Sequence, residues 1–379
     1  MAQKSTIVLI GPAYPFRGGI SQTQSQFAQS LSAKGNKVYI WTFTHLYPKI
    51  LFSGSSQFDF NQPKGDLKVY RIIHSYNFLN WKKVARSLNK IRPDVIVFRY
   101  YSPLLAPCYG SILKSLEPGI LKIALVDNWI GHEKRIFDSL LNRYFSKHIH
   151  KFTTLSENVA EQIANKVNSK PIWFQNHPIA SDLPKRVDKN FARNQLGWNI
   201  NARIVLFYGI IRKYKGLDLL LKAFGEEPLY SDCIELKVVG DCYQNESHYR
   251  KILTKYRLQK RVNLNFNYAD DQLTQLLFSA SDLLVLPYRS STQSGVISLA
   301  YHYSLPLVIS NAKGLSQIVN KDGSGFTSNN FPIDLGNTIQ RALKSNNINR
   351  FKRNILNVKK EYSWDTYAEN WLEFINNPL

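Results

Sequence analysis

The strongest constraint on the fold is a local pattern that occurs in both halves of the 379-residue chain. A short apolar run ends at a glycine and is followed by a stretch with helical spacing. The run 5–10 ends at Gly11 before a helical stretch over 21–34, and the run 203–208 ends at Gly209 before one over 217–224. Buried strands that alternate with helices are typical of a parallel sheet. The sequence therefore predicts an α/β protein with two similar parallel-sheet domains.

Further apolar runs extend both predicted sheets, at 37–42, 94–98, 122–126, 151–155, 235–240, 282–287 and 307–310. The segment 177–190 contains Pro178 and Pro184 and has no apolar period, which is typical of a linker. We predict an N-terminal domain over 1–178, a C-terminal domain over 191–355, and a terminal helix over 356–379 that packs back across the domains. Open parallel sheets bind ligands beyond the carboxyl ends of their strands, so we expect the active site between the domains.

The net charge of the chain limits the classes of partner that it is expected to bind. It contains 49 Lys and Arg against 27 Asp and Glu, a formal net charge of +22, which attracts phosphate-rich ligands, nucleic acid or anionic lipid. The sequence carries no signature of a nucleic-acid-binding module, so we expect no nucleic-acid partner. The basic stretches 81–92 and 143–151 contain aromatic residues and are candidates for contact with an anionic membrane, but charged helix faces are also common on solvated surfaces.

Cysteine content and apolar run lengths predict the location. Cys108, Cys233 and Cys242 are too few and too scattered for a disulfide framework, which favours a reducing compartment. The apolar runs are far shorter than the ~20 residues that span a bilayer. The N-terminus lacks the pattern of a secretion signal. We expect a cytoplasmic protein, attached peripherally to the inner face of the cytoplasmic membrane.

Two loops of the second half carry residues that suit phosphate chemistry. The loop 209–216 places Arg212 and Lys215 between two glycines directly after a strand. Arg and Lys stabilise the charge that develops on a departing nucleoside diphosphate, although a solvated basic loop has the same composition. After the strand 282–287, a loop of small polar residues opens a helix whose free N–H groups suit a diphosphate or sugar hydroxyls, although a Ser/Thr-capped helix would look the same. The residues of this second loop are Thr292, Gln293, Ser294 and Gly295.

Together these loops resemble the two donor-site motifs of the family-four (group 1) retaining glycosyltransferases, in 209–216 and 287–306. The resemblance extends to the Gly18-Gly19 loop after the first strand and covers essentially the whole chain. It implies the GT-B architecture, in which two Rossmann-like domains face a central cleft. It also implies a hexosyltransferase that moves a sugar, with retention, from a UDP- or GDP-type donor to a glycan or polyprenyl-linked acceptor. Such enzymes build bacterial lipopolysaccharide, capsule and exopolysaccharide.

The resemblance assigns the donor-side residues. Lys215 matches the family's lysine on the donor diphosphate, whereas the common arginine position holds Ile210, so Arg212 is the expected substitute. Gly209 belongs to the same loop, and Gly18 and Gly19 would let the backbone approach the phosphates. Gly240 and Tyr268 match the positions that hold ribose and base, although Tyr268 is also plausible as core packing.

One feature departs from the family pattern. Two glutamates usually stand eight residues apart in the second motif, where this chain has Ser291 and Leu299. The sugar and ribose contacts would then depend on the hydroxyl, amide and N–H groups of the loop 292–295.

Acceptor-side candidates lie in the first half. Asp127 occupies a strand-end position where the family often has a histidine, and Asp127, His132 and Glu133 are candidates for catalytic polar chemistry. His45, Tyr100 and Asn128 are candidates for acceptor binding. A helix cap with a His–Glu pair, and aromatic packing at strand ends, are the open alternatives.

We expect no metal and no cofactor besides the nucleotide sugar, because Arg212 and Lys215 supply the positive charge and the sequence contains no Asp-x-Asp cluster. A nicotinamide or flavin enzyme is disfavoured because the first loop lacks the Gly-x-Gly-x-x-Gly order. A catalytically degenerate relative that only binds glycan or nucleotide remains the alternative.

Overall fold

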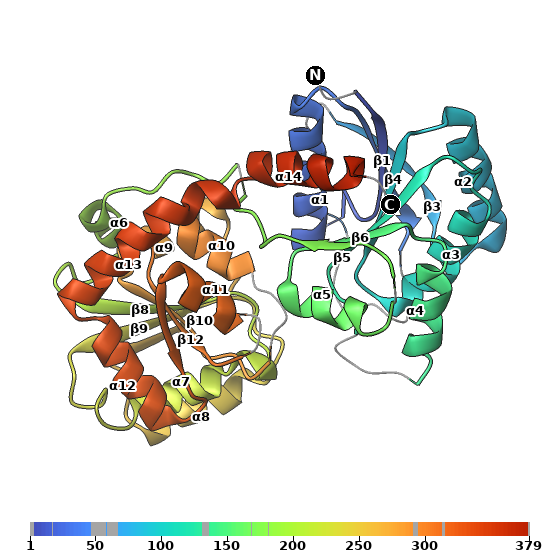
Figure 1. The fold of residues 1–379 in the computed structure, drawn as a ribbon. Coiled ribbons are helices and arrows are strands. Elements are labelled where there is room, and N and C mark those ends of the chain that lie inside the picture. Colours follow the sequence, from blue (N-terminus) through green and yellow to red (C-terminus); the bar gives the residue numbers. More distant parts are fainter. Residues whose placement is uncertain are drawn as a thin grey trace. The chain divides into compact units, whose positions relative to one another are not determined.

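The computed structural model describes residues 4–16, 18–46, 58, 67–130, 136–167, 169–180, 182–290, 295–312 and 315–377. The chain forms two compact units (Figure 1). The first comprises Met1–Asn176 and Trp364–Leu379, and the second comprises His177–Ser363. The chain therefore passes from one unit to the other after Asn176 and returns after Ser363.

The described part of the first unit is built on a seven-stranded sheet with the order β3-β2-β1-β4-β5-β6-β7. Every neighbouring pair is parallel. The strands are β1 (Thr6–Ile10), β2 (Lys37–His45), β3 (Lys68–His74), β4 (Val95–Tyr100), β5 (Leu121–Val126), β6 (Lys151–Thr154) and β7 (Ile172–Phe174). The helices are α1 (Gly19–Ala33), α2 (Phe78–Ile91), η2 (Pro103–Leu105), α3 (Ala106–Lys114), α4 (Asp138–Ser146), α5 (Glu157–Ala164) and α14 (Trp364–Asn376).

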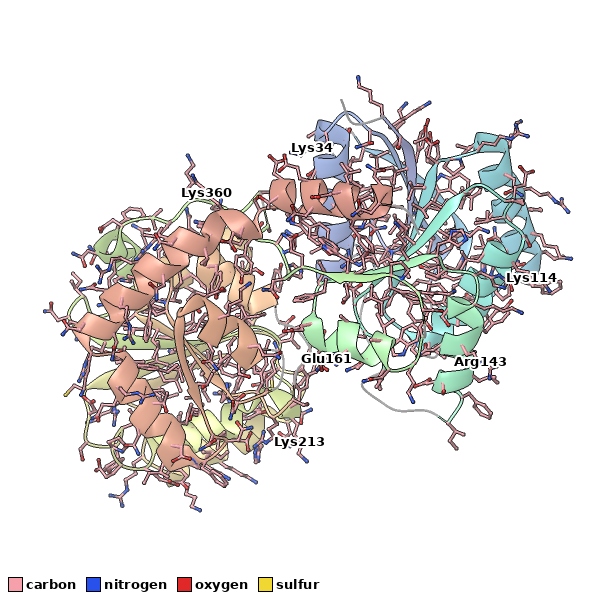
Figure 2. The ribbon with its side chains drawn as sticks, viewed as in Figure 1. Lys34, Lys114, Arg143, Glu161, Lys213 and Lys360 are labelled. Atoms are coloured by element: carbon pink, nitrogen blue, oxygen red, sulfur yellow. The ribbon has the colours of Figure 1, made fainter. Side chains whose placement is uncertain are left out.

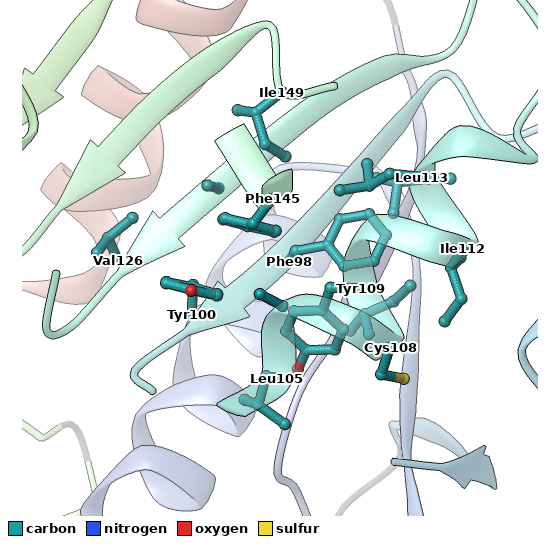
Figure 3. Close-up of a cluster of buried hydrophobic side chains, with 14 of the residues drawn as sticks. Phe98, Tyr100, Leu105, Cys108, Tyr109, Ile112, Leu113, Val126, Phe145 and Ile149 are labelled. Atoms are coloured by element: carbon teal, nitrogen blue, oxygen red, sulfur yellow. The ribbon is translucent and has the colours of Figure 1, made fainter. Parts of the chain in front are cut away.

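Side chains alternate across this sheet and form one core on each face. Val8 and Ile10 belong to the core under α3 and α4, whereas Ile7 and Leu9 belong to the core under α1 and α14. The first core contains Phe98, Tyr109 and Phe145 (Figure 3). In the second, Phe27 of α1 contacts three rings of α14, with centroids 5.1 to 6.0 Å apart. This aromatic packing holds the C-terminal helix on the first unit.

The described part of the second unit repeats the design with a six-stranded parallel sheet of order β10-β9-β8-β11-β12-β13. The strands are β8 (Arg203–Tyr208), β9 (Ile234–Val239), β10 (Val262–Asn265), β11 (Leu283–Leu286), β12 (Leu307–Ser310) and β13 (Gly325–Ser328). The helices are α6 (Lys189–Leu196), η3 (Lys213–Lys215), α7 (Leu217–Phe224), α8 (Glu246–Lys255), α9 (Asp271–Ala280), α10 (Gly295–His302), α11 (Leu315–Asp322), α12 (Pro332–Ala342), α13 (Ser345–Val358) and η4 (Lys359–Tyr362).

The predicted α/β class with two Rossmann-like parallel sheets is confirmed. The segment 356–379, expected as one terminal helix, is divided. The end of α13 and all of η4 belong to the second unit, and α14 belongs to the first. Across the described ranges, the helices lack the combined length and apolarity needed to cross a membrane.

Candidate functional site

The loop that follows β8 is fixed against the loop that follows β9. The N–H of Ile211 donates to the carbonyl of Asp241 at 2.8 Å, and the N–H of Tyr243 donates to the carbonyl of Ile211 at 3.0 Å. A Cβ on Gly240 would lie 2.2 Å from the carbonyl oxygen of Gly209, and Gly240 has a φ of +149°. Only glycine therefore allows the two loops to approach so closely.

Lys215 is the buried cation of this loop. It ends η3, and only 9% of the residue is exposed. Its Nζ lies 5.2 Å from the ring centre of Tyr288. Burial lowers the pKa of Lys215, the charge of Arg212 lowers it further, and Tyr214 opposes the shift. Among the described residues, Lys215 has no ion pair and no hydrogen bond from Nζ. The site therefore keeps a desolvated positive charge without a described protein anion.

Arg289 and Asp218 form an ion pair, here called the Arg289 brace, that fixes the backbone on both sides of Lys215. The Arg289 guanidinium donates to both carboxylate oxygens of Asp218, at 2.9 and 2.6 Å, and to the carbonyl of Lys213 at 2.7 Å. The N–H of Arg289 also donates to the carbonyl of Tyr214 at 2.6 Å. Burial alone would raise the pKa of Asp218, but the hydrogen bonds and charge of Arg289 outweigh it and lower that pKa. Sequence reasoning missed this brace, because its residues stand 71 positions apart.

The remaining donor-side candidates lie at the same edge of the sheet. Arg212 is exposed, with its guanidinium 5.2 Å from the ring centre of Tyr243. Tyr268 is exposed just after β10, and Gly295 begins α10 after β11. Because β10, β9, β8 and β11 are neighbours and parallel, these residues gather at the carboxyl ends of four adjacent strands.

The first unit also buries a cation at its strand ends, but this one is paired. The Nε and Nη2 atoms of Arg99, near the end of β4, donate to the two carboxylate oxygens of Asp127, each at 2.6 Å. Both side chains are almost fully buried, at 1% and 3% exposure. The pair forms because β4 and β5 are adjacent in register, and the N–H of Asp127 donates to the carbonyl of Tyr100. Asp127 is a buried counter-ion.

Comparison with known proteins assigns the second unit to a family. Residues 188–361 match the model described as "Glycosyl transferases group 1". The match covers nearly all of the second unit, His177–Ser363. A 136-residue stretch is 25% identical to the GDP-mannose:glycolipid 4-beta-D-mannosyltransferase of Xanthomonas campestris pv. campestris. That stretch covers 36% of this chain and spans 38% of the length of the relative.

Solved structures of similar fold cover the whole chain. A sucrose-phosphate synthase from Thermosynechococcus elongatus aligns with a TM-score of 0.74 at 16% identity, over 98% of each chain. A glycosyltransferase from Rickettsia africae aligns with 0.72 at 15% identity, over 99% of this chain and 100% of the other. WaaG, a glycosyltransferase involved in lipopolysaccharide biosynthesis, aligns with 0.67 at 16% identity, over 98% and 100%. At these identities the likeness concerns the fold, which is GT-B.

The structure places two of the acceptor-side candidates in buried positions. Asp127 was expected to present a polar group to the acceptor, but both of its oxygens accept from buried Arg99. Tyr100 is fully buried, stacks on Phe145 with centroids 4.0 Å apart, and donates its hydroxyl to Asn142 at 2.6 Å (Figure 3). Tyr100 ends β4, a central strand whose residues are all buried, so its side chain completes the core. Asp127 directly follows β5, and its carboxylate is buried with Arg99.

The predicted roles of the remaining donor-side and acceptor-side candidates stay predictions. His45 is exposed at the end of β2 and stacks on His74, with centroids 4.5 Å apart, and Asn128 is half-buried. Gly18 precedes α1 and Gly19 begins it, and a Cβ on either would meet no atom within 4 Å. The other candidates lie outside the described residues, namely His132, Glu133, Thr292, Gln293 and Ser294. Ser291 also lies outside them, whereas Leu299 packs partly buried in the core of the second unit.

Proposed function

We propose that this chain is a glycosyltransferase that moves a sugar, with retention, from a nucleotide diphosphate sugar to a glycan or polyprenyl-linked acceptor in bacterial surface-polysaccharide biosynthesis. It would work in the cytoplasm at the inner face of the membrane. The observation that carries the proposal is the buried ammonium of Lys215, which has no acidic partner among the described residues.

A desolvated cation without a counter-ion is unfavourable in the free protein and becomes favourable when an anion binds. A nucleoside diphosphate supplies that anion and gains negative charge as the sugar leaves. Lys215 therefore stabilises the leaving group most when the sugar–phosphate bond breaks. Exposed Arg212 would supply a second cation to the same diphosphate.

The proposed donor is GDP-mannose or another GDP- or UDP-sugar. The relative from Xanthomonas uses GDP-mannose by its name, and the aligned stretch is the support for giving this donor first place. Exposed Tyr268, just after β10, is the proposed stacking surface for the base.

The binding test compares Lys215→Ala with Lys213→Ala. Both lysines belong to η3, but Lys213 is exposed and its contact with Arg289 uses only its backbone carbonyl. Loss of a charged hydrogen bond should weaken nucleotide affinity about 10- to 100-fold in Lys215→Ala and leave Lys213→Ala close to wild type. Titration calorimetry with GDP, UDP, ADP and dTDP measures this. Equal affinity in the two variants would overturn the donor-site assignment.

The second test is transfer itself. Purified protein incubated with GDP-mannose and a lipid-linked glycan should form a mannosylated product whose anomeric proton, read by NMR, shows retention. The relative's name specifies a beta linkage, so an α-linked donor that yields a β product would replace retention with inversion. Nucleotide binding without transfer or donor hydrolysis would favour the degenerate binder.

We also propose that turnover needs no metal, because Lys215 and Arg212 can neutralise the diphosphate. Among the described residues, no group of three or more His, Cys, Asp or Glu is arranged to hold a metal ion. Turnover should persist in excess EDTA. Loss of turnover that added Mg²⁺ restores would contradict this part of the proposal.

A further inference from the structure

A pocket of about 300 Å³ lies at the border of the sheet in the second unit, at the carboxyl ends of β12 and β13. Asn311 directly follows β12, Thr327 and Ser328 end β13, and Asn329 follows them. Open parallel sheets bind ligands beyond the carboxyl ends of their strands, and small-molecule sites occupy about 300 to 1,000 Å³. The pocket therefore has the place of a ligand site and room for one small ligand.

The other wall of this pocket is a polar face of helix α12. Asp334, Asn337, Thr338 and Arg341 line the pocket, and they recur at the three- and four-residue spacing of one helix face. The apolar side of the same helix is buried in the core of the second unit through Leu335, Ile339 and Ala342. Each residue that lines the pocket is polar or charged. An apolar ligand therefore finds no matching surface there.

Three side chains of the pocket offer hydrogen-bond donors to a ligand. Asn311 and Asn337 make no side-chain hydrogen bond within the described part of the chain. The guanidinium of Arg341 lies 3.9 Å from the ring centre of Phe326 and has no acidic partner among the described residues. Amide and guanidinium N–H groups are strong donors to oxygen, so these three side chains suit a ligand that is rich in oxygen atoms.

The pocket also contains one carboxylate. The Oδ2 of Asp334 accepts from the Nδ2 of Asn329 at 3.1 Å, and its Oδ1 accepts no hydrogen bond from a described residue. Asp334 and Arg341 give the lining one negative and one positive charge, and a phosphate group would meet the like charge of Asp334. Sugar hydroxyls both donate and accept, so they match this mixture of groups.

We propose that this pocket binds one sugar unit of a neutral glycan, separately from the nucleotide-sugar site around Lys215. The ring of Phe331 is 65% exposed and stands in the chain between Asn329 and Asp334, two residues that line the pocket. It supplies a stacking surface for the apolar face of the sugar ring. The inference rests on the proposed function only in taking a glycan as the source of that sugar.

The pocket and the donor loop lie on the same edge of the sheet and share a neighbour in Tyr288. The hydroxyl of Ser310, at the end of β12, donates to the carbonyl of Tyr288. The ring of Tyr288 lies 5.2 Å from Nζ of Lys215. A glycan in the pocket is therefore held at the edge where the donor binds, without use of the residues that bind the nucleotide.

A pocket of about 420 Å³ in the first unit is the rival sugar site. Its lining includes Gln162 of α5, and it contains two cations, Arg143 and Lys166, against one acid, Asp138. This excess of positive charge favours an anionic ligand, whereas the pocket at β12 and β13 is balanced. A direct comparison of the two pockets is the sharpest test for a neutral sugar.

The experiment titrates the full chain with neutral trisaccharides, namely mannotriose, maltotriose, cellotriose and chitotriose, and follows binding by saturation-transfer NMR. Asn311→Ala with Asn337→Ala should weaken the affinity for the best probe about 10- to 100-fold, because two hydrogen-bonding amides are removed. Phe331→Ser should weaken it about 3- to 10-fold. The controls are Asn194→Ala, an exposed asparagine of α6, and Lys213→Ala, the exposed lysine labelled in Figure 2. Both controls should bind like the wild type.

Thermal unfolding shows whether each variant is folded. Asn337→Asp is the second variant, because it keeps the size of the side chain and places a carboxylate near Asp334 in the lining, and it should weaken binding about tenfold. Wild-type affinity in the folded variants would overturn the proposal. So would a loss confined to Gln162→Ala, or the absence of binding of any probe to the wild type.

Titration with GDP and UDP separates this inference from the proposed function. The pocket variants should bind nucleotide like the wild type, and Lys215→Ala should keep the wild-type affinity for the trisaccharide. Failure of the wild type to bind any nucleotide would count against the donor site alone. Parallel loss of nucleotide and trisaccharide binding in Lys215→Ala would mean that the two ligands share one site, which contradicts a separate pocket.

Discussion

Each unit buries a cation near the carboxyl ends of its strands, Arg99 in the first and Lys215 in the second, and the two cations are paired differently. In the first, Arg99 is 1% exposed and both oxygens of Asp127 neutralise it. In the second, Lys215 is 9% exposed and faces the ring of Tyr288, without an acidic partner among the described residues. Burial without a partner is unfavourable, so it points to a ligand that completes the site.

The two cations are also held by different means. A side-chain carboxylate holds Arg99, whereas backbone geometry holds Lys215. Gly216 follows η3 with a φ of +70°, and Arg289 donates to the carbonyls of residues 213 and 214. The charge of Arg99 is therefore neutralised within the core, whereas the backbone holds the charge of Lys215 in a position where a ligand can bind it.

Asp127→Asn should destabilise the protein by about 3–5 kcal/mol, because it leaves Arg99 buried without a counter-charge. Denaturant unfolding followed by circular dichroism measures the loss. Glu161→Gln, on the surface of α5, is the control and should change the free energy of unfolding by less than about 0.5 kcal/mol. An Asp127→Asn variant as stable as the control would show that Arg99 does not need its partner.

Gly216→Ala tests the backbone that presents Lys215. A Cβ there would lie 2.0 Å from the carbonyl oxygen of Pro287, and the left-handed φ adds strain, so we expect a loss of about 2–4 kcal/mol. Gly197→Ala has a similar φ of +64° but no atom within 4 Å of its Cβ, and should lose only about 1 kcal/mol. Equal losses in the two variants would mean that the contact with Pro287 is unimportant.

Lys215→Met should leave the ligand-free protein as stable as the wild type or raise its free energy of unfolding by about 1 kcal/mol, since it removes a buried charge that has no acidic partner among the described residues. The same variant should lose the rise in melting temperature that nucleotide gives the wild type. Thermal unfolding with and without GDP or UDP measures both. A clear destabilisation of the ligand-free variant would give Lys215 a structural role like that of Arg99.

The pH dependence of that difference is the smallest effect. The folded pKa of Lys215 is lowered from 10.5, so the unfolded chain binds more protons in the window between the two values. Stability due to this group therefore rises with pH through that window. The advantage of Lys215→Met over the wild type should be largest near neutral pH and shrink as pH approaches 10.5. A difference that is constant with pH would contradict the lowered pKa.

The strands that sequence analysis named are the central ones, and those it missed are the edges of the two sheets. β3, β7, β10 and β13 are the terminal strands in the two strand orders. They are only partly buried, so they lack the continuous apolar run of a strand such as β1. Hydrophobic runs therefore predict the interior of a parallel sheet better than its borders.

In the candidate site, local sequence patterns predict where polar residues stand in the chain but not which residues they contact. Local sequence placed Arg212 and Lys215 in a loop after a strand, and the structure has them there. Asp127 also follows a strand as expected, but its partner Arg99 stands 28 positions earlier, and no local pattern reveals that pairing. The brace between Arg289 and Asp218 escaped detection for the same reason.

Local sequence patterns were enough to predict the alternation of strands and helices, the two sheets and the cationic loop after β8. Each of these features depends on residues that are close together in the sequence, within about one strand or one helical turn. The hydrophobic periodicity of such a segment therefore predicts its secondary structure directly. Which buried charges have a counter-ion depends on contacts that form only in the folded chain. Strand register buried Asp127 against Arg99 and left Lys215 without a described acid, and the return of the chain after Ser363 brought α14 to the first unit. Contacts between residues far apart in the chain arise only when the sheets assemble, because burial and pairing are properties of the packed core and not of any local segment.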